Sequence, residues 1–133
     1  MFTKQQLSFI IFLMSFGFVL LGQKKQNPPV LEMTLHDFME EYTKPATKLY
    51  EKKNNSEYLI KILKQLPSLA PAIEREDWQS IVDVKLANNK PEDTCKSCHT
   101  KFKKEYKKNF RKKLIIVPEE FTGFPEEIKS LLK

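Results

Sequence analysis

Residues Cys95-Lys96-Ser97-Cys98-His99 form the stretch on which the fold and the chemistry of this chain depend. Two cysteines separated by two residues, with a histidine directly after the second, are typical of covalent attachment of haem c. On a helix, this spacing brings both thiols to one edge of a porphyrin, and His99 can bind the iron from the same side. We therefore predict one covalent haem c, attached to Cys95 and Cys98, with His99 as an axial ligand.

Three other sites use similar residues. A redox-active Cys-x-x-Cys pair usually opens a helix in a βαβ unit, and no strand pattern precedes Cys95. A structural zinc site needs about four ligands, which the motif and the distant His36 would supply poorly. A plain disulfide between Cys95 and Cys98 would leave His99 without a role. These alternatives stay open, but haem attachment accounts for all three motif residues.

The N-terminus has the pattern of a targeting segment. Lys4 precedes an apolar run from Leu7 to Leu21, which is typical of a secretory signal peptide and short for a membrane span. We predict a signal peptide over residues 1–22, cleaved after Gly22, and hence a periplasmic protein. An uncleaved segment would instead anchor the protein to the membrane by residues 7–21. Residues 23–33 contain Pro28 and Pro29 and are predicted to form a flexible leader.

The positive charge of the chain is concentrated in one segment. The formal net charge is +6, and residues 94–113 carry nine basic residues against the single acid Glu105. We do not expect nucleic acid as a partner of an exported protein. Lys101, Lys104 and Lys108 are candidates for docking an acidic redox partner, although a solvated helix face would have the same composition.

Length and periodicity predict an all-α fold in one small domain. A chain of 133 residues with three glycines and many Lys, Glu, Leu and Ile residues favours helices over a β-sandwich. Apolar residues recur at helical spacing in four segments. The predicted helices cover residues 35–52 with a kink at Pro45, residues 57–73 with breaks at Pro67 and Pro71, residues 74–87, and residues 91–113.

The fourth predicted helix places its chemistry on one face. At 100° per residue, one sector of this helix holds the two cysteines, the histidine and three aromatic residues, Phe102, Tyr106 and Phe110. Domain boundaries follow from these helices: residues 34–113 form a haem-binding four-helix bundle, and residues 114–133 form a tail that packs on it.

The motif and its position resemble the class II cytochromes c, the cytochrome c′ and cytochrome c-556 family. The stretch from Cys95 to Lys103 is similar to that family's Cys-x-x-Cys-His-x-x-Tyr-Arg pattern, with Phe102 and Lys103 in the last two places. The resemblance covers roughly residues 35–111. It implies an antiparallel four-helix bundle, with middle helices that are short or broken here, and it makes a homodimer possible. The tail after Leu114 has no counterpart in the family.

The resemblance also implies a sixth iron ligand on the first helix. In low-spin members a methionine there completes the coordination, and Met39 has the matching position; His36 or an open site are the alternatives. Met39 could also be an ordinary core residue. The predicted haem pocket consists of Leu35, Phe38, Tyr42, Leu59, Phe102 and Tyr106.

With both axial positions filled, no site for a substrate remains, and we expect a one-electron carrier and not an enzyme. An alternative is a five-coordinate protein similar to cytochrome c′ that binds nitric oxide or carbon monoxide beside Phe38, Tyr42 and Leu59. Another is a haem-free exported protein in which Cys95 and Cys98 form a dithiol and disulfide pair.

Overall fold

The computed structural model describes residues 30–133, so the predicted signal peptide, its cleavage after Gly22 and the possible anchor over residues 7–21 lie outside the described residues. The helical elements are α2 (Leu35–Phe38), the π-helical turn η2 (Met39–Thr43), α3 (Lys44–Lys53), α4 (Glu57–Leu69), the 3₁₀ turn η3 (Ala72–Glu74), α5 (Arg75–Ala87), α6 (Asp93–Asn109), the 3₁₀ turn η4 (Glu119–Phe121) and α7 (Phe124–Leu132). The strands are β1 (Glu32–Thr34) and β2 (Leu114–Ile116). Within residues 30–133, no helix has the length and hydropathy needed to span a membrane.

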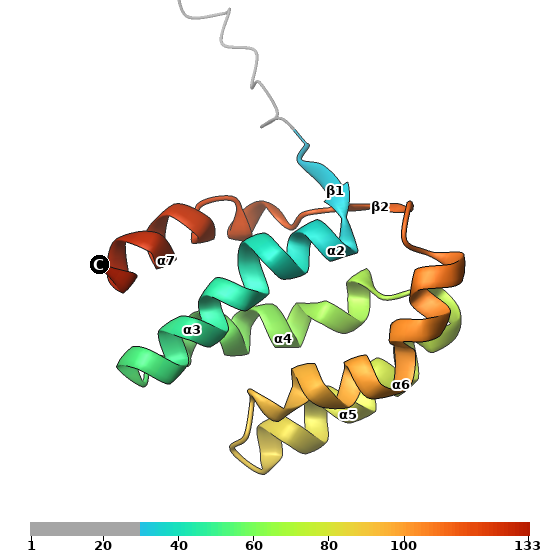
Figure 1. Ribbon diagram of the computed structural model, residues 1–133, viewed down its shortest axis with the longest axis horizontal. Helices are drawn as coiled ribbons and strands as arrows, with labels where there is room; N and C mark the ends of the chain where they lie inside the picture. Colours follow the sequence, from blue (N-terminus) through green and yellow to red (C-terminus); the bar gives the residue numbers. More distant parts are fainter. Residues whose placement is uncertain (1–29) are drawn as a thin grey trace, which may run out of the picture.

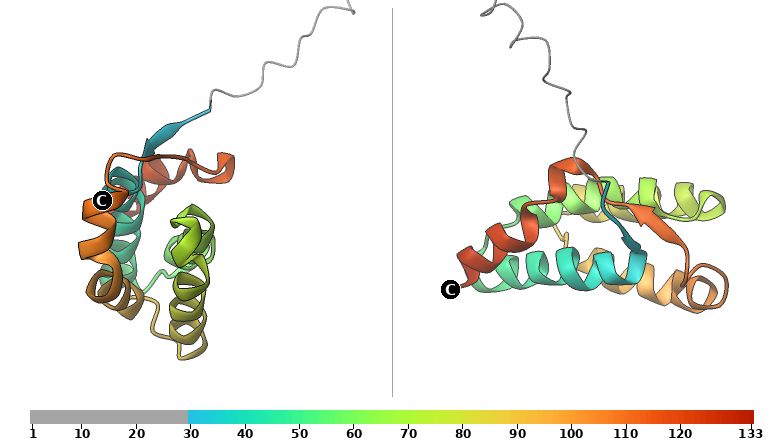
Figure 2. Two further views of the ribbon diagram at one scale, coloured as in Figure 1. Left: turned by 90° about the vertical axis from the view of Figure 1, so that its right-hand side faces the viewer. Right: turned by 90° about the horizontal axis from the view of Figure 1, so that it is seen from above.

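The fold is mostly helical, as predicted, with a small two-stranded sheet in addition. α4 packs along α5, α5 along α6, and α7 against α3. The left view in Figure 2 shows α4 and α5 in one layer and α2, α3 and α6 in the other. The strands lie on the opposite side of the molecule from α5 (Figure 1).

α2, η2 and α3 together form one continuous helical segment, the first helix, over nearly the range predicted. Thr34 caps it, because its hydroxyl accepts a hydrogen bond of 3.1 Å from the Asp37 N–H. A kink at Pro45 was predicted, and the structure has a π-helical turn, η2, shortly before this proline. The Lys44 N–H donates to the Met39 carbonyl, five residues back, and Pro45 has no N–H to continue an α-helical pattern. A turn of this kind takes an extra residue, so it changes which residues share a face.

The start and the end of α4 differ in detail from the prediction. Ser56 precedes the helix, but its side chain makes no capping hydrogen bond; instead the Asn55 side-chain oxygen accepts one of 3.1 Å from the Glu57 N–H. Pro67 lies inside α4, and the helix ends at Leu69. Ile73, expected on the apolar face, is 88% exposed because η3 redirects the chain there.

The C-terminal tail completes the core of the molecule. Phe121, Phe124 and Ile128 are buried, and the Phe121 ring lies 6.3 Å from the Phe38 ring between centroids. The Tyr58 hydroxyl donates a hydrogen bond of 3.0 Å to Glu127, which joins α4 to α7. The tail is therefore part of the hydrophobic core and not a peripheral extension.

The strands correct one prediction about the leader. β1 pairs antiparallel with β2, with Glu32 opposite Ile116 and Thr34 opposite Leu114, and the Val117 N–H donates to the Leu31 carbonyl over 2.9 Å. Residues 31–33 are thus paired with the tail, whereas a flexible leader was predicted through residue 33. A three-residue strand has too few residues to show a periodicity of two in the sequence.

Candidate functional site

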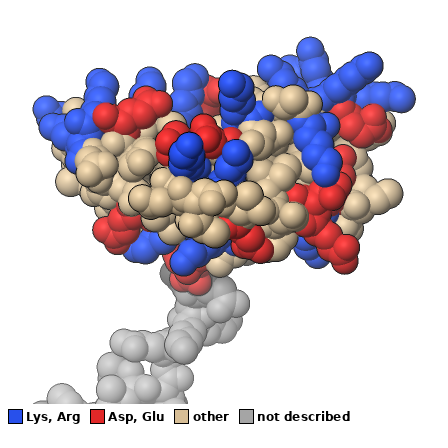
Figure 3. Space-filling model, turned by 90° about the horizontal axis from the view of Figure 1, so that it is seen from below, with Lys and Arg blue, Asp and Glu red and all other residues tan. Residues whose placement is uncertain are grey.

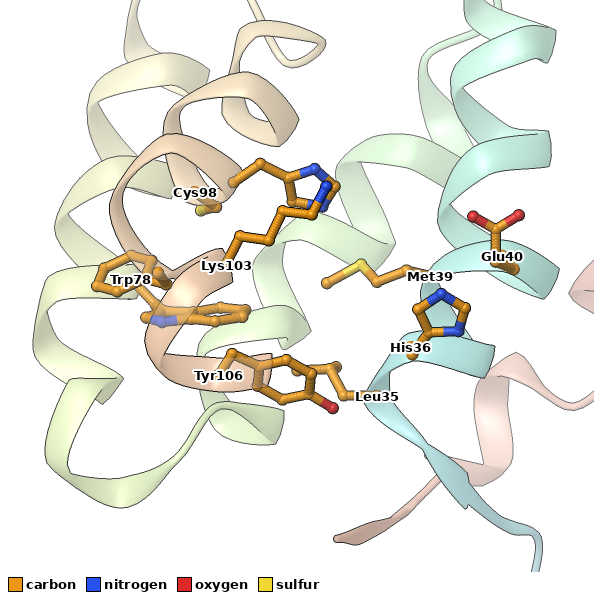
Figure 4. Close-up of a pocket in the computed structure, with 10 residues that line it drawn as sticks. Leu35, His36, Met39, Glu40, Trp78, Cys98, Lys103 and Tyr106 are labelled. Carbon is orange, nitrogen blue, oxygen red and sulfur yellow. The ribbon is translucent and has the colours of Figure 1, made fainter. Parts of the chain in front are cut away.

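A mostly apolar cavity of about 220 Å³ lies between the first helix and α6. Figure 4 shows the side chains that line it. They are Leu35, His36, Met39, Glu40, Trp78, Cys98, His99, Phe102, Lys103 and Tyr106. The structure therefore brings Met39, Cys98 and His99 to one cavity, although Met39 is far from the motif in sequence.

α6 contributes the cavity residues through its helical spacing. Cys98 and Phe102, four residues apart, are both buried on the inner face. His99 is exposed at the edge of the cavity, where its imidazole is accessible. Most lysines of α6 lie on the outer face, whereas Lys103 lines the cavity beside His99.

Two stacked aromatic rings close the cavity on the α5 side. The Trp78 and Phe102 rings lie 5.3 Å apart between centroids, at 25°, and the Trp78 indole N–H donates a hydrogen bond of 3.2 Å to Glu74. This bond fixes the ring orientation, so the pair presents a rigid apolar surface to the cavity. Trp78 was predicted to point inward but was not assigned to the site.

The first helix presents three residues with different surroundings. In Figure 4 the Met39 side chain points from its helix toward α6. The His36 imidazole is 62% exposed, with Nδ1 3.5 Å from an oxygen of Asp37. Glu40 forms an ion pair of 2.6 Å with Lys44 on its own helix. Met39 is therefore the residue of the first helix that presents a soft ligand atom to α6.

Cys95 lies away from this cavity. It is half-buried and faces the Thr47 hydroxyl of α3, whereas Cys98 lines the cavity. Sequence spacing placed both thiols on one edge of a single site. In the structure only Cys98 lines the cavity, although residues three apart lie on the same face of a helix.

Burial makes both thiols weaker acids than a free cysteine. Burial raises the pKa of the Cys98 thiol to about 11, and it raises the pKa of Cys95 against the lowering effect of the Thr47 hydroxyl. Redox-active cysteines have lowered pKa values, because the thiolate is the reactive form. At neutral pH both thiols are protonated, which is the opposite of what a dithiol exchange site needs.

Three predicted pocket residues lie elsewhere. Phe38, Tyr42 and Leu59 are fully buried in the core, not beside the cavity. The Phe38 and Tyr42 rings stack at 4.7 Å and 12° on the side of the first helix that α4 and α7 cover. The prediction placed them beside Met39 because it treated residues 35–50 as a regular α-helix facing one interior. The segment instead has two buried sides.

One lining residue has an unpaired polar atom. The Tyr106 hydroxyl is buried with no hydrogen-bond partner in the described part of the chain. Burial raises its pKa, and the nearby backbone N–H groups of His36 and Leu35 oppose that rise. A buried hydroxyl without a hydrogen-bond partner costs folding free energy, so the Tyr106 hydroxyl makes this side of the molecule less stable than a fully hydrogen-bonded one.

The candidate docking lysines differ in their pairing. Lys101 forms an ion pair of 2.9 Å with Asp77 of α5, while Lys104 and Lys108 are exposed and have no ion pair within residues 30–133. Figure 3 shows Lys and Arg side chains gathered along one edge of the molecule, with acidic side chains among them.

The residues around the cavity fit a haem in their chemistry. A thiol, an imidazole and a thioether line one space with aromatic side chains, which are the groups that attach, ligate and shield haem c. The cavity is smaller than the range of about 300–1,000 Å³ that is usual for ligand sites. α6 makes its extensive contacts with α5 and not with α2, so the cavity lies at a lightly packed interface between α2 and α6.

The alternative zinc site is not assembled in this structure. Within residues 30–133, no three side chains from His, Cys, Asp and Glu lie close enough to share a metal ion. Comparison with protein-family models, with curated proteins and with solved structures gives no match for this chain.

Proposed function

We propose that this chain is an exported c-type cytochrome, similar to class II cytochromes c, that carries single electrons in the periplasm. One haem c would lie in a four-helix bundle, between the first helix and α6. The observation that supports this most strongly is the shared cavity: Cys98 and His99 from α6 and Met39 from the first helix line the same apolar space. Met39 lies sixty residues before His99 in the sequence, and the fold brings the two to the same cavity.

The roles of these residues follow from their chemistry. Cys95 and Cys98 would hold the ring by thioether bonds, and His99 and Met39 would bind the iron; of these four, Cys95 does not line the cavity. When bound, a haem supplies a one-electron couple between ferric and ferrous iron. A soft thioether such as that of Met39 would favour the ferrous form, and with both ligands in place the iron would have no position for a substrate.

The surrounding residues control access and docking. The Trp78–Phe102 stack and Leu35 exclude water, and a dry site raises the cost of the extra charge of ferric iron. Lys104 and Lys108 provide positive charge that attracts an acidic redox partner at a distance. Lys101 contributes less to this attraction, because Asp77 neutralises it.

Two alternatives are less favoured by the geometry. A five-coordinate gas-binding protein would need space beside Phe38, Tyr42 and Leu59, and these three side chains are fully packed. A dithiol protein would need a reactive thiolate, and burial raises the pKa of both cysteines. The carrier would instead use the cavity at Met39 and His99, although its predicted pocket also included Phe38, Tyr42 and Leu59.

Spectra of the holoprotein test the proposal. The chain is produced together with haem c maturation proteins, and ferric and ferrous spectra are recorded for wild type, Met39→Ala and Met33→Ala. Met33 is a matched control, because it is a half-buried methionine that does not line the cavity. We expect a methionine–iron charge-transfer band in the red that Met39→Ala removes and Met33→Ala leaves unchanged.

Two results would contradict the proposal at different levels. A mature protein whose mass equals its polypeptide contains no covalent haem, and the whole proposal fails. A covalent haem whose spectra are the same in wild type and Met39→Ala removes Met39 as a ligand, and a matching experiment with His36→Ala then tests the other candidate.

A further inference from the structure

Exposed aliphatic side chains gather where the two strands meet. Val30 is 67% exposed, Leu31 37%, and Leu114 and Ile116 61% each. We call Val30, Leu114 and Ile116 the ribbon face. Leu114 and Ile116 lie on β2, and Val30 directly precedes the paired segment, in which the Val117 N–H donates to the Leu31 carbonyl. Leu31 is opposite Val117 and so belongs to the inward side of the ribbon. Contiguous exposed apolar residues of this kind mark contact sites on a protein.

The strand geometry turns these residues outward. Ile115 is half-buried, whereas its neighbours Leu114 and Ile116 are exposed, which is the alternation that a strand with one covered side produces. Ile115 and Val117 pack inward. Leu114 and Ile116 therefore play no part in the core, and folding does not account for their apolar character.

Basic residues border the ribbon face. The end of α6 and the turn after it carry Lys107, Arg111, Lys112 and Lys113, all exposed, which we call the basic rim. Arg111 and Lys112 lie beside Thr34 of β1 around one shallow depression. Glu32 and Asp37 offset part of this charge, and Asp37 is in turn paired with His36.

The chain enters the fold at this same place. The apolar run ends at Leu21, and eight residues separate it from Val30. Eight residues extend to about 30 Å at most. A bilayer that held residues 7–21 would therefore lie within that distance of Val30.

We propose that the ribbon face and the basic rim bind the surface of an anionic lipid bilayer. Aliphatic side chains at the centre would enter the headgroup region, and lysines and arginines around them would contact lipid phosphates. The binding is a property of the folded domain, so it does not require the apolar run to remain attached. It is also independent of the haem.

Hydrogen exchange tests the proposal on the exported protein, whose mass is recorded first. Vesicles of phosphatidylglycerol should slow exchange in residues 30–34 and 111–117, and vesicles of phosphatidylcholine should not. Residues 48–53 of α3 serve as the internal reference. Unchanged exchange in residues 30–34 and 111–117 with phosphatidylglycerol would overturn the proposal.

Variants then separate the two parts of the surface. Leu114→Ser with Ile116→Ser should lower vesicle affinity about tenfold or more, because two aliphatic side chains leave the interface. Arg111→Gln, Lys112→Gln and Lys113→Gln together should lower it by a similar or larger factor, about tenfold to a hundredfold. Glu32→Gln should raise it, since this change removes a negative charge from the same strands.

Matched controls carry the same changes elsewhere. Val84→Ser replaces a 54% exposed aliphatic residue on α5, and Lys48→Gln, Lys52→Gln and Lys53→Gln remove three exposed charges from α3. Neither control should alter vesicle affinity. Equal losses in controls and test variants would overturn the proposal, as would a dimer that the Leu114 and Ile116 changes dissociate in the absence of lipid binding.

Discussion

The two sides of the first helix are packed very differently. On the side that α4 and α7 cover, Phe38, Tyr42 and Leu49 have almost no exposed surface. On the side that faces α6, Met39 is half-buried, His36 is exposed, and a cavity remains. The first side is a finished core, and the second is an interior whose packing is incomplete.

The difference teaches where a ligand can be accommodated. A close-packed core has no room for an additional group, and filling it costs stability. The α6 side has a cavity and a Tyr106 hydroxyl without a hydrogen-bond partner. It also has a thiol that can bond to a porphyrin and an imidazole and a thioether that can bind iron. A cofactor there would complete the packing that the polypeptide leaves unfinished.

The largest expected effect concerns the α6 side. Replacing both motif cysteines, Cys95→Ala with Cys98→Ala, should remove all covalently held haem, because no other thiol exists in the chain. The measurement is the mass and the haem absorbance of the protein after denaturation. Ser97→Ala, between the two cysteines, is the control and should keep both. Haem retained by the double variant after denaturation would contradict the assignment.

The next effect compares the two sides directly through stability. Phe121→Ala should lower the free energy of unfolding by about 3–5 kcal/mol, since it leaves a void beside Phe38 in the finished core. Tyr106→Phe should change it by less than about 1 kcal/mol, because the hydroxyl it removes has no partner to lose. Urea unfolding measures both. A loss of several kcal/mol in Tyr106→Phe would show that the hydroxyl has a partner, and a small loss in Phe121→Ala would show that the core beside Phe38 is loosely packed.

A third effect depends on pH and on the buried thiol. In the protein without haem, burial raises the pKa of Cys98 from 9.0 to about 11. The folded state then holds a proton that the unfolded state releases above pH 9.0, so stability falls as pH rises from there toward 11. Thermal unfolding across this range measures the decline, and Cys98→Ala should make it shallower. An unchanged pH profile in the variant would indicate that other groups cause the decline.

The smallest effect concerns the surface of α6. Lys101→Gln breaks an exposed ion pair with Asp77 and should cost less than about 1 kcal/mol, and Lys104→Gln should cost nothing measurable. For the rate of electron transfer to an acidic partner, Lys104→Gln should cause the larger loss, because Lys104 has no ion-pair partner among residues 30–133 and Lys101 is neutralised by Asp77. Stopped-flow rates at low and high salt measure this. An equal loss of rate in the two variants would contradict the distinction.

The sequence predicted the helical fold and the phase of α6 well. Cys98 and Phe102 are buried and the lysines exposed, as the wheel indicates, because a regular α-helix keeps 100° per residue throughout. The helix bounds were also close, because Asn54 and Asn89 adopt left-handed conformations that end their helices. Periodicity works where the backbone is regular.

It failed where the backbone is irregular or the partner is distant. The π-helical turn begins at Met39 and changes the angle between Met39 and Tyr42, and Phe38, the preceding residue, points to a different side. The residues of the predicted pocket are therefore divided between the cavity and the core. The β1–β2 pairing joins segments from opposite ends of the chain, and three residues carry no pattern of their own. Trp78 reached the site through its stack with Phe102, a contact between two helices that a single-helix wheel does not contain.

The pairing of Glu32 with Ile116 also joins two segments that are far apart in the sequence. These residues enclose nearly every helix, so the entropy of closing that loop is recovered only after the intervening helices have packed. If the chain is exported and receives a haem as proposed, Cys95 to His99 would emerge before Leu114, and the two strands would pair after the motif becomes accessible.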